Sequence, residues 1–286
     1  MSEETKVWFV TGSSTGFGRE IALQALERGY RVAATARNTD TLAELVEKYP
    51  DTAKAFKLDV TDSSDITNAV KDAVEAFGKI DILVNNAGYG LGGGIEEPTL
   101  EQIRHQYETN VFGVMNMMRE VLPHMRAQKS GHILNISSVV GFRALPSAGY
   151  YSSTKFAMEA LSEALAMETD HLGIKVTIVE PGGFRTDFAG RSFVQPAKRI
   201  DDYITSERID NISDFDGAQP GDPVKGVKAI IDMVETGNPP LRLPLGEDCV
   251  TAMEEKLEAV KLNVAEWREI AVDTAVDEEQ AGATGS

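Results

Sequence analysis

Apolar residues follow two alternating patterns along this chain. Short runs rich in Val, Ile and Phe predict β-strands, and longer stretches with an apolar residue at every third or fourth position predict helices. The predicted strands span residues 6–12, 30–37, 53–60, 80–88, 131–138, 174–183 and 239–246. The predicted helices span residues 17–29, 39–49, 64–78, 101–125, 150–173, 222–237 and 247–271.

This alternation predicts an α/β fold. Parallel strands joined through helices of ten or more residues form right-handed crossovers, so that helices cover both faces of the sheet. We therefore expect a three-layer, doubly wound parallel sheet with seven strands in the order 3-2-1-4-5-6-7.

The chain shows no linker that would divide it before Gly183, so residues 1–286 are predicted to form a single domain. Residues 5–182 form its core. Residues 183–222 mix aromatic, charged and turn residues, and a segment of this length is typical of a lid or binding loop. Residues 223–272 are predicted to complete the fold with a helix, a strand and a helix, and residues 273–286 to form a disordered tail.

Three glycines follow the first strand, in the segment TGSSTGFG. Gly12 permits a tight turn, Gly16 lets the backbone approach a pyrophosphate, and Gly18 lets the helix pack close to the strand. The N-terminus of the helix that follows offers free N–H groups to phosphates. Because the loop lies between a first strand and a first helix, it predicts dinucleotide binding. The expected contacts of this loop are Gly12, Ser14, Thr15, Gly16, Phe17 and Gly18.

Charge and composition narrow the possible partners. The formal net charge is −17, and long-range repulsion opposes binding to nucleic acid and to anionic membranes. With Cys249 as the one cysteine, no intrachain disulfide can form. The N-terminal residues carry no export signal or membrane span, and the four histidines show no ligand spacing, so no metal site is expected. We expect a soluble, cytoplasmic protein.

Further motifs resemble the short-chain dehydrogenase/reductase family, in collinear order over residues 5–190. NNAG at residues 85–88 resembles the family segment that stabilises the sheet and borders the cofactor. LDV at residues 58–60 lies at the end of the third strand, where the family places an adenine contact. PGGFRT at residues 181–186 resembles the turn beside the nicotinamide. One departure is Phe17, where isoleucine or leucine is more common. The resemblance implies a Rossmann-like, NAD(P)-binding oxidoreductase, with further cofactor contacts from Asp59, Val60, Asn86, Ala87, Gly88, Tyr151, Lys155, Pro181, Gly182, Phe184 and Thr186.

Two adjacent tyrosines precede a lysine in the segment YYSSTK. Residues four apart on a helix share one face, so Tyr151 and Lys155 converge on one site, whereas Tyr150 faces elsewhere, onto substrate or another subunit. The resemblance implies two more catalytic residues: Ser138, thirteen positions before Tyr151, and Asn110, which helps to hold a water in a proton relay. Ser137 competes with its neighbour, but alternation along the strand directs it to the other face.

These residues predict the chemistry of a carbonyl and a secondary alcohol. A nicotinamide transfers the hydride, and a protein group must exchange a proton with the substrate oxygen. We expect Lys155, together with the charge of the oxidised nicotinamide, to lower the pKa of Tyr151 so that this residue acts as general acid and base. Ser138 is expected to hydrogen-bond the substrate oxygen, and Lys155 to bond the nicotinamide ribose.

The end of the second strand predicts which nicotinamide cofactor is used. Enzymes that select NAD usually place a carboxylate there, and an arginine favours the 2′-phosphate of NADP. Ala36 stands at the position of the acid and Arg37 follows it. NADP(H) is therefore expected in preference to NAD(H). The alternative is that this arginine lies on a solvated loop without contact to the cofactor.

The substrate is expected under the segment after Gly183, at the carboxyl ends of the strands. Apolar walls there indicate a neutral ketone, aldehyde or alcohol, and leave steroid, retinoid, sugar and aromatic ketone open. The resemblance implies a homodimer or homotetramer formed by helices around residues 100–126 and 150–172. Two rival functions are a regulator or scaffold that binds cofactor without turnover, and a nucleotide-sugar epimerase or dehydratase. The expected substrate walls are Val140, Phe142, Leu145, Phe184 and Phe188.

Overall fold

A parallel sheet of seven strands forms the centre of the molecule, in the order β3-β2-β1-β4-β6-β7-β9. The computed structural model describes residues 5–188, 190, 192–205 and 217–275. The predicted strand order is confirmed; the labels shift because two short strands, β5 and β8, pair with each other in a separate sheet. The strands are β1 Val7–Val10, β2 Arg31–Ala36, β3 Ala53–Lys57, β4 Ile82–Asn85, β5 Gly90–Leu91, β6 Gly131–Ile136, β7 Ile174–Pro181, β8 Phe193–Val194 and β9 Arg242–Leu245.

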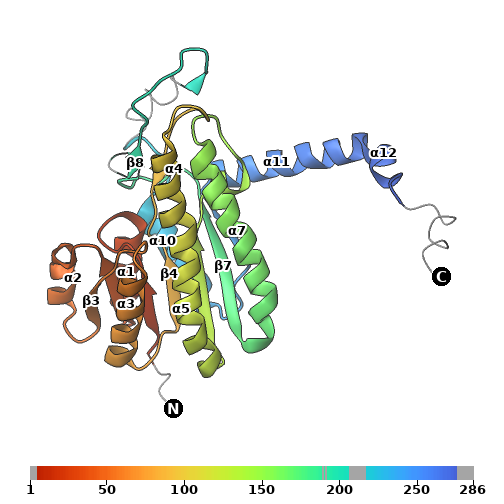
Figure 1. The fold of residues 1–286 in the computed structure, drawn as a ribbon. Helices are drawn as coiled ribbons and strands as arrows, with labels where there is room; N and C mark the ends of the chain where they lie inside the picture. The colour runs from red at the N-terminus through yellow and green to blue at the C-terminus, as the bar shows by residue number, and fades with distance from the viewer. Residues whose placement is uncertain (1–4, 189, 191, 206–216, 276–286) are drawn as a thin grey trace, which may run out of the picture.

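Helices cover both faces of the sheet and complete the three layers (Figure 1). The α-helices are α1 Gly16–Glu27, α2 Ala43–Lys48, α3 Ser63–Phe77, α4 Leu100–Tyr107, α5 Gly113–Gln128, α6 Val139–Phe142, α7 Gly149–Thr169, α10 Pro223–Glu235, α11 Glu247–Glu266 and α12 Arg268–Val272. The shorter helical segments are η1 Thr39–Leu42, η2 Glu108–Phe112 and η3 Asp170–Leu172.

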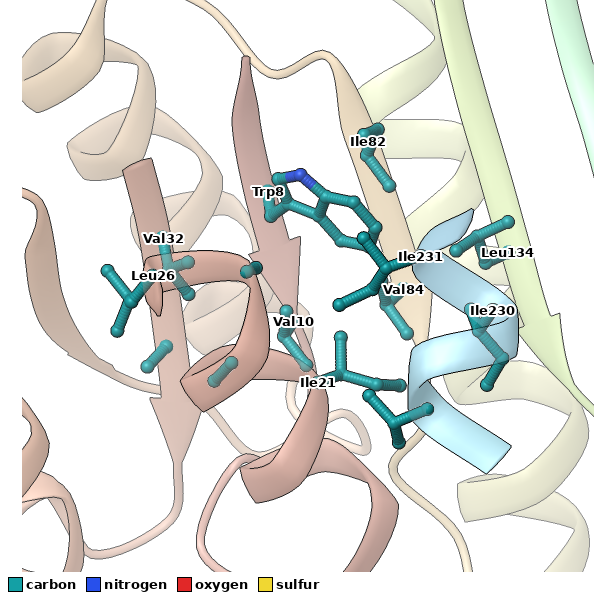
Figure 2. Packing of buried hydrophobic residues seen from close by; sticks show 14 of the residues in the cluster. Trp8, Val10, Ile21, Leu26, Val32, Ile82, Val84, Leu134, Ile230 and Ile231 are labelled. Carbon is teal, nitrogen blue, oxygen red and sulfur yellow. The ribbon is translucent and has the colours of Figure 1, made fainter. Parts of the chain in front are cut away.

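Alternate residues of the central strands point into two separate cores. On one face, Trp8 and Val10 of β1 pack with Ile21 of α1 and with Ile230 and Ile231 of α10, as Figure 2 shows. On the other face, the remaining residues of β1 pack with apolar residues of α3, α5 and α7. All four residues of β1 are buried, as expected for a parallel strand covered on both sides.

The helix predicted over residues 101–125 is interrupted by a π-helical turn. Thr99 begins α4 with a capping box that pairs it reciprocally with Gln102. The turn η2 then separates α4 from α5 and contains Asn110. A π-turn is read from backbone hydrogen bonds and leaves the apolar periodicity nearly intact, so the sequence pattern did not reveal it; such turns are frequent at functional sites.

The segment after Gly183 contacts the body of the fold through β8, which pairs in parallel with β5, and through the backbone N–H of Ile200, which donates to Glu97 Oε1 at 2.8 Å. An isolated bridge between Phe184 and Gly221 joins the two ends of the segment. The predicted lid over residues 183–222 includes residues 189, 191 and 206–216, which lie outside the described part, as do residues 276–286 of the predicted tail. The last helices differ from the others, because α11 projects away from the layers (Figure 1).

Candidate active site

A cavity of about 1150 Å³ lies where the central strands end. All strands of the main sheet run parallel, so their carboxyl ends share one edge, where ligands of doubly wound folds bind. The lining brings together the loops after β1, β2, β4, β6 and β7. Residues separated by more than 170 positions in the chain therefore face one space.

The glycine loop has the backbone conformation that its residues predict. Gly12 and Gly16 adopt positive φ values of 67° and 57°, which residues with a side chain rarely adopt. A methyl group at Gly18 would overlap with the carbonyl oxygen of Gly12 and with the side-chain amide of Asn86. Gly18 thus allows close helix–strand packing, as expected, but does not line the cavity.

Asn86 holds this loop from the neighbouring strand. Its side-chain Nδ2 donates hydrogen bonds to the carbonyl oxygens of Thr11 at 3.0 Å and Gly12 at 3.1 Å. In return, Thr11 Oγ1 accepts from the backbone N–H groups of Asn86 at 2.9 Å and Ala87 at 3.0 Å. At the start of α1, Thr15 provides no side-chain cap to the first-turn N–H groups. The loop is therefore fixed from behind while these donors face the cavity side, which suits a diphosphate.

Ser138, Tyr151 and Lys155 meet at the other end of the cavity. The hydroxyl of Tyr151 is hydrogen-bonded to Ser138. Lys155 Nζ lies 5.8 Å from the centroid of the Tyr151 ring and donates to the carbonyl oxygen of Ile136 at 2.7 Å. The structure thus brings together in one cavity three of the four residues that the sequence selects for catalysis.

Burial shifts the pKa values of the tyrosine and the lysine. Desolvation raises the pKa of Tyr151. The hydrogen bond with Ser138 lowers this pKa, but by less than desolvation raises it. Desolvation also lowers the pKa of Lys155 to about 8, against the charge of Glu159. The expectation of a lowered tyrosine pKa is therefore not met by the protein groups alone, because burial disfavours the phenolate more than the hydrogen bond with Ser138 favours it.

The hydroxyl groups of the two competing residues have other hydrogen-bond partners. Tyr150 donates its hydroxyl proton to the carbonyl oxygen of Ile95 at 2.8 Å. Ser137 donates to Glu159 Oε1 at 2.5 Å. Both hydroxyl groups are occupied by other partners, although Ser137 also lies in the lining of the cavity. The selection of Tyr151 and Ser138 stays a prediction.

Asn110 lies behind the cavity rather than in its lining. Its Nδ2 donates to the carbonyl oxygen of Tyr89 at 2.9 Å and to Thr154 Oγ1 at 3.2 Å, and its Oδ1 accepts from the backbone N–H of Tyr89 at 3.1 Å. A methyl group at Gly88 would lie 3.1 Å from Asn110 Oδ1 and 3.8 Å from Lys155 Nζ. The asparagine therefore positions the end of β4 beside the lysine.

A buried ionic cluster that the sequence did not predict lies beneath the lysine. Arg242 of β9 donates from Nη1 to Glu159 Oε2 at 2.8 Å and from Nη2 to Glu163 Oε1 at 2.5 Å, and it also pairs with Glu180 of β7. Burial raises the pKa of Glu180 to about 7 despite this arginine. The one available signal was the spacing of Glu159, four residues after Lys155 on one helical face.

Most of the predicted cofactor contacts line the cavity. Ala36 and Arg37 lie at its edge after β2, and Asp59 lies beside them after β3. The carboxylate of Asp59 accepts from both the backbone N–H and the hydroxyl of Thr61. Of the predicted cofactor contacts, those in the lining are Gly12, Ser14, Thr15, Gly16, Phe17, Arg37, Asp59, Val60, Asn86, Ala87, Gly88, Tyr151, Lys155, Pro181, Gly182, Phe184 and Thr186.

The predicted substrate walls are in the lining with one exception. Val140, Leu145, Phe184 and Phe188 face the cavity, and the ring of Phe188 lies 5.3 Å from that of Tyr151. Phe142 does not line it: α6 turns this ring away, to 5.4 Å from the guanidinium of Arg242. The expectation for Phe142 is therefore corrected, because a short helix unpredicted from the sequence replaces an extended loop after Ser138.

Sequence patterns did not reveal several further wall residues. Leu91 of β5 and Phe193 of β8 line the cavity, and the short parallel pairing brings them together. Asp248 also lines it, and its Oδ2 accepts from the backbone N–H of Gly183 at 2.7 Å. Two-residue strands are too short to leave a periodic signal.

Comparisons with known proteins agree with this site. Residues 6–196 match the family described as "short chain dehydrogenase". "Oxidoreductase BOA17" from Botryotinia fuckeliana is 37% identical over 273 residues, which cover 95% of this chain and 100% of that protein. A "3-ketodihydrosphingosine reductase" from Bacteroides thetaiotaomicron is 37% identical, covering 85% of this chain and 88% of that protein. A short-chain dehydrogenase structure from Streptomyces avermitilis has a TM-score of 0.90 and 41% identity, covering 96% of this chain and 100% of that one.

More distant solved structures carry either nicotinamide dinucleotide. An alcohol dehydrogenase from the archaeon Thermococcus sibiricus, 26% identical with a TM-score of 0.69, is complexed with 5-hydroxy-NADP; 85% of this chain and 96% of that one are covered. A 3-ketoacyl-(acyl-carrier-protein) reductase from Brucella melitensis, 26% identical with a TM-score of 0.72, is complexed with NADH; 85% and 97% are covered.

The described residues lack two further kinds of feature, a metal site and a membrane-spanning helix. These residues include no group of three or more His, Cys, Asp or Glu side chains that could hold a metal ion. In the same part of the chain, each helix is too short or too polar to cross a lipid bilayer.

Proposed function

The chain belongs to the short-chain dehydrogenase family, and on this basis we propose that it is an NADP(H)-dependent oxidoreductase that interconverts a carbonyl compound and its alcohol. The single observation that carries the proposal is the convergence of Ser138, Tyr151 and Lys155 in the same cavity as the glycine loop. A scaffold that binds a nucleotide without turnover would not require a buried tyrosine, hydrogen-bonded to a serine, beside a buried ammonium.

The residues at this site fit a dinucleotide. Gly12 and Gly16 adopt positive φ values and, as glycines, have no side chain that would keep a diphosphate away from the loop. Asn86 holds the loop from behind. When bound, the dinucleotide would supply or accept the hydride. The loop after β1 would hold its diphosphate, and Lys155 would bond the nicotinamide ribose.

Tyr151 would exchange the proton with the substrate oxygen. In the reducing direction its hydroxyl gives a proton to the oxygen of the former carbonyl, and in the oxidising direction the phenolate takes it back. Ser138 would donate a hydrogen bond to the same oxygen and stabilise the charge that develops there. Because burial raises the tyrosine pKa, the residue is held as a proton donor, and the lysine ammonium provides the main protein charge that favours the phenolate.

Asn110 would act by positioning and by helping to hold a water of the proton relay. Its three side-chain hydrogen bonds connect Tyr89, which follows β4, with Thr154, the residue before Lys155. This arrangement keeps the end of β4, the π-turn and α7 in register at the lysine.

The preference for NADP(H) rests on Arg37. This residue is exposed at the edge of the cavity, next to buried Ala36, and no acidic side chain stands where a carboxylate would bond the ribose. A charge-assisted hydrogen bond to a phosphate contributes about 1.5–3 kcal/mol, which corresponds to a preference of about ten- to a hundredfold. We expect Arg37→Gln to reduce the ratio of kcat/KM for NADPH over NADH, and Arg37→Asp to reverse it; an unchanged ratio in both variants would exclude this role.

The substrate is proposed to be a neutral ketone or secondary alcohol with an apolar body. Val140, Leu145, Leu91, Phe188 and Phe193 provide apolar walls. The relationship to a protein named 3-ketodihydrosphingosine reductase is in keeping with a ketone. Location in the cytoplasm and assembly as a homodimer or homotetramer through α4, α5 and α7 stay predictions.

The test of the proposed function uses the neighbouring tyrosine as its control. A panel of aliphatic, aromatic and steroid ketones is assayed with NADPH and NADH by the absorbance of the reduced nicotinamide. Tyr151→Phe should lower kcat by about 10²–10⁴-fold, whereas Tyr150→Phe, which loses only a bond to the Ile95 carbonyl, should stay within a few-fold of the wild type. Equal activity of both variants, or tight dinucleotide binding without turnover on any ketone or alcohol, would favour the scaffold function instead.

A further inference from the structure

Helix α11 forms an arm whose contacts with the body of the protomer lie in its first half. Cys249 is the one buried residue of this helix. Glu255 pairs with Arg143 at 2.5 Å, and Lys256 Nζ lies 5.9 Å from the centroid of the Phe156 ring. Beyond these contacts the helix runs away from the three layers (Figure 1). Its direction is therefore defined, while most of its length lies outside the body of the protomer.

The exposed part of this arm carries an unbroken apolar seam. Apolar residues recur with spacings of 3, 4, 3, 4 and 3, and every first and fourth position of the heptad is apolar from Val250 to Trp267. Such a pattern is typical of a helix that packs against another helix. The seam consists of Val250, Met253, Leu257, Val260, Val264 and Trp267. All of these side chains except Met253 are exposed, by between 40% for Val250 and 58% for Val264.

A solvated helix does not need this seam. Isolated helices of this length are marginal in water, and helices in proteins are stabilised mainly by packing of their apolar face. Between the seam positions the residues are mostly charged or small, and Leu262 is the one large apolar residue of α11 beyond Val250 that lies off the seam. The exposed apolar surface is thus concentrated on one stripe, which indicates a partner helix.

We propose that this partner is α11 of a second copy of the chain, packed in the opposite direction. The residues that flank the seam are Glu254 and Lys261 on one side, and Lys256 and Asn263 on the other. In an antiparallel pair, like sides face each other, so Glu254 of each copy faces Lys261 of the second copy. Two ion pairs form by symmetry, and Lys256 faces Asn263 without repulsion.

Charge excludes the parallel arrangement. In a parallel pair, the two opposite sides of the seam face each other, so Lys256 of each copy would face Lys261 of the other. This arrangement creates two like-charge contacts and no attractive one, and flanking charges set the orientation of paired helices. Lys261 is paired within its own helix to Glu258 at 3.2 Å, with both side chains mostly exposed, and such a surface pair exchanges partners at little cost.

The same register matches the apolar residues. With Glu254 opposite Lys261, the layers pair Leu257 with Val260, Met253 with Val264, and Val250 with Trp267 of the second copy. The largest side chain, at the tip of one arm, then lies against a valine at the start of the other. All pairs fall within residues 250–267, before α12 begins at Arg268.

The first test is the mass of the purified full-length chain by size exclusion with light scattering. Val260→Asp places a charge in the centre of the seam and should halve the mass of the wild-type assembly. Leu262→Asp is the matched control, because it makes the same kind of change two residues away, at a side chain that is 61% exposed and lies off the seam; its mass should equal that of the wild type. A monomeric wild type, or equal masses for both variants, would overturn the proposal and would point to another occupant of the seam.

The second test reverses charge without touching the apolar seam, so that misfolding cannot imitate the result. Glu254→Lys and Lys261→Glu should each weaken the assembly, and the double variant should restore it. Weakening by each single change without restoration in the double variant would contradict the proposed register.

The third test determines direction. Chains with Leu257→Cys and with Val260→Cys, oxidised separately, should form little disulfide, and a mixture of the two should form the mixed disulfide. Efficient self-linkage of Leu257→Cys alone would show a parallel pair and refute the antiparallel one. The wild type, whose Cys249 is buried, provides the background.

Discussion

Arg242 should be worth more to stability than any guanidinium on the surface of this protein, and Arg242→Met tests this. The arginine lies between Glu159, whose side chain is 4% exposed, and Glu180, whose side chain is fully buried. Methionine keeps much of the volume but leaves two buried carboxylates without their counter-charge. Removal of one partner from a buried ion pair costs about 3–5 kcal/mol.

The lower end of that range applies here. The Arg242 side chain is itself 27% exposed, so water can replace part of its interaction with the carboxylates. A loss of about 3 kcal/mol, at about 2–4 °C per kcal/mol for a chain of this size, lowers Tm by about 6–12 °C. The loss should be measured by calorimetry of the dinucleotide-free protein, with chemical unfolding as a second measurement.

The deficit should also depend on pH. Burial already raises the pKa of Glu180 from 4.5 to about 7 with the arginine present. Removal of Arg242 should raise the pKa of Glu180 further. A carboxyl whose folded pKa is raised supports folding fully below the unfolded pKa and loses that contribution as pH rises through the folded pKa. Near pH 4.5 the Glu180 carboxyl is protonated in both folded proteins, so Arg242→Met should lie close to the wild type there. Its deficit should open as the pH rises through about 7, where the wild-type carboxyl ionises and that of the variant does not, and should grow until the pH exceeds the higher pKa of the variant.

Arg28→Met is the matched control. Arg28 also bridges two carboxylates, those of Asp232 and Glu235 at 2.6 and 2.7 Å, but these are 46% and 37% exposed. Exposed pairs contribute about 0–1 kcal/mol, so this variant should lose no more than about 4 °C. Equal losses for the two variants at pH 8, or a deficit at Arg242 that is independent of pH, would refute the assignment of a buried ionic cluster.

Three further outcomes are expected. Gly18→Ala, whose methyl group would overlap with the glycine loop, should weaken dinucleotide binding at least about tenfold in a titration, whereas Gly29→Ala, which meets open space, should cost only stability, about 1 kcal/mol; equal affinities would contradict the role of close packing. Because the folded pKa of Lys155 is lowered to about 8, the wild type should gain up to about 3 kcal/mol of unfolding free energy relative to Lys155→Met between pH 7 and pH 10.5; a constant difference across this range would show that the lysine pKa is not depressed. Phe188→Ala, which removes the ring 5.3 Å from that of Tyr151, should raise KM for the ketone and leave KM for the dinucleotide unchanged; a change in the dinucleotide KM alone would place this residue at the cofactor instead.

Much of the site could be predicted because strands and helices convert spacing into direction. Alternation along the strand predicted over residues 131–138 separated Ser138 from Ser137, and the period of α7 separated Tyr151 from Tyr150. The order of the strands was also predictable, since right-handed crossovers leave few topologies open. The glycine loop, the end of β2 and the end of β4 then had to share one edge of the sheet.

Other features arise only where distant segments pack together. The ionic cluster joins α7, β7 and β9, and Asn86 braces a glycine loop that lies more than 70 residues before it. The π-turn at Asn110 and the rotation of Phe142 toward Arg242 depend on neighbouring elements rather than on local periodicity. The raised pKa of Tyr151 depends on how completely the assembled cavity wall excludes water.

By itself, then, the amino-acid sequence determined which residues lie on one face of each element and at which edge of the sheet they meet. The tertiary structure alone decided how deeply those residues are buried and which charges lie beside them. The physical reason is range: periodicity acts over a few residues along one backbone, whereas desolvation and ion pairing depend on distances between segments that come together only when the chain is folded.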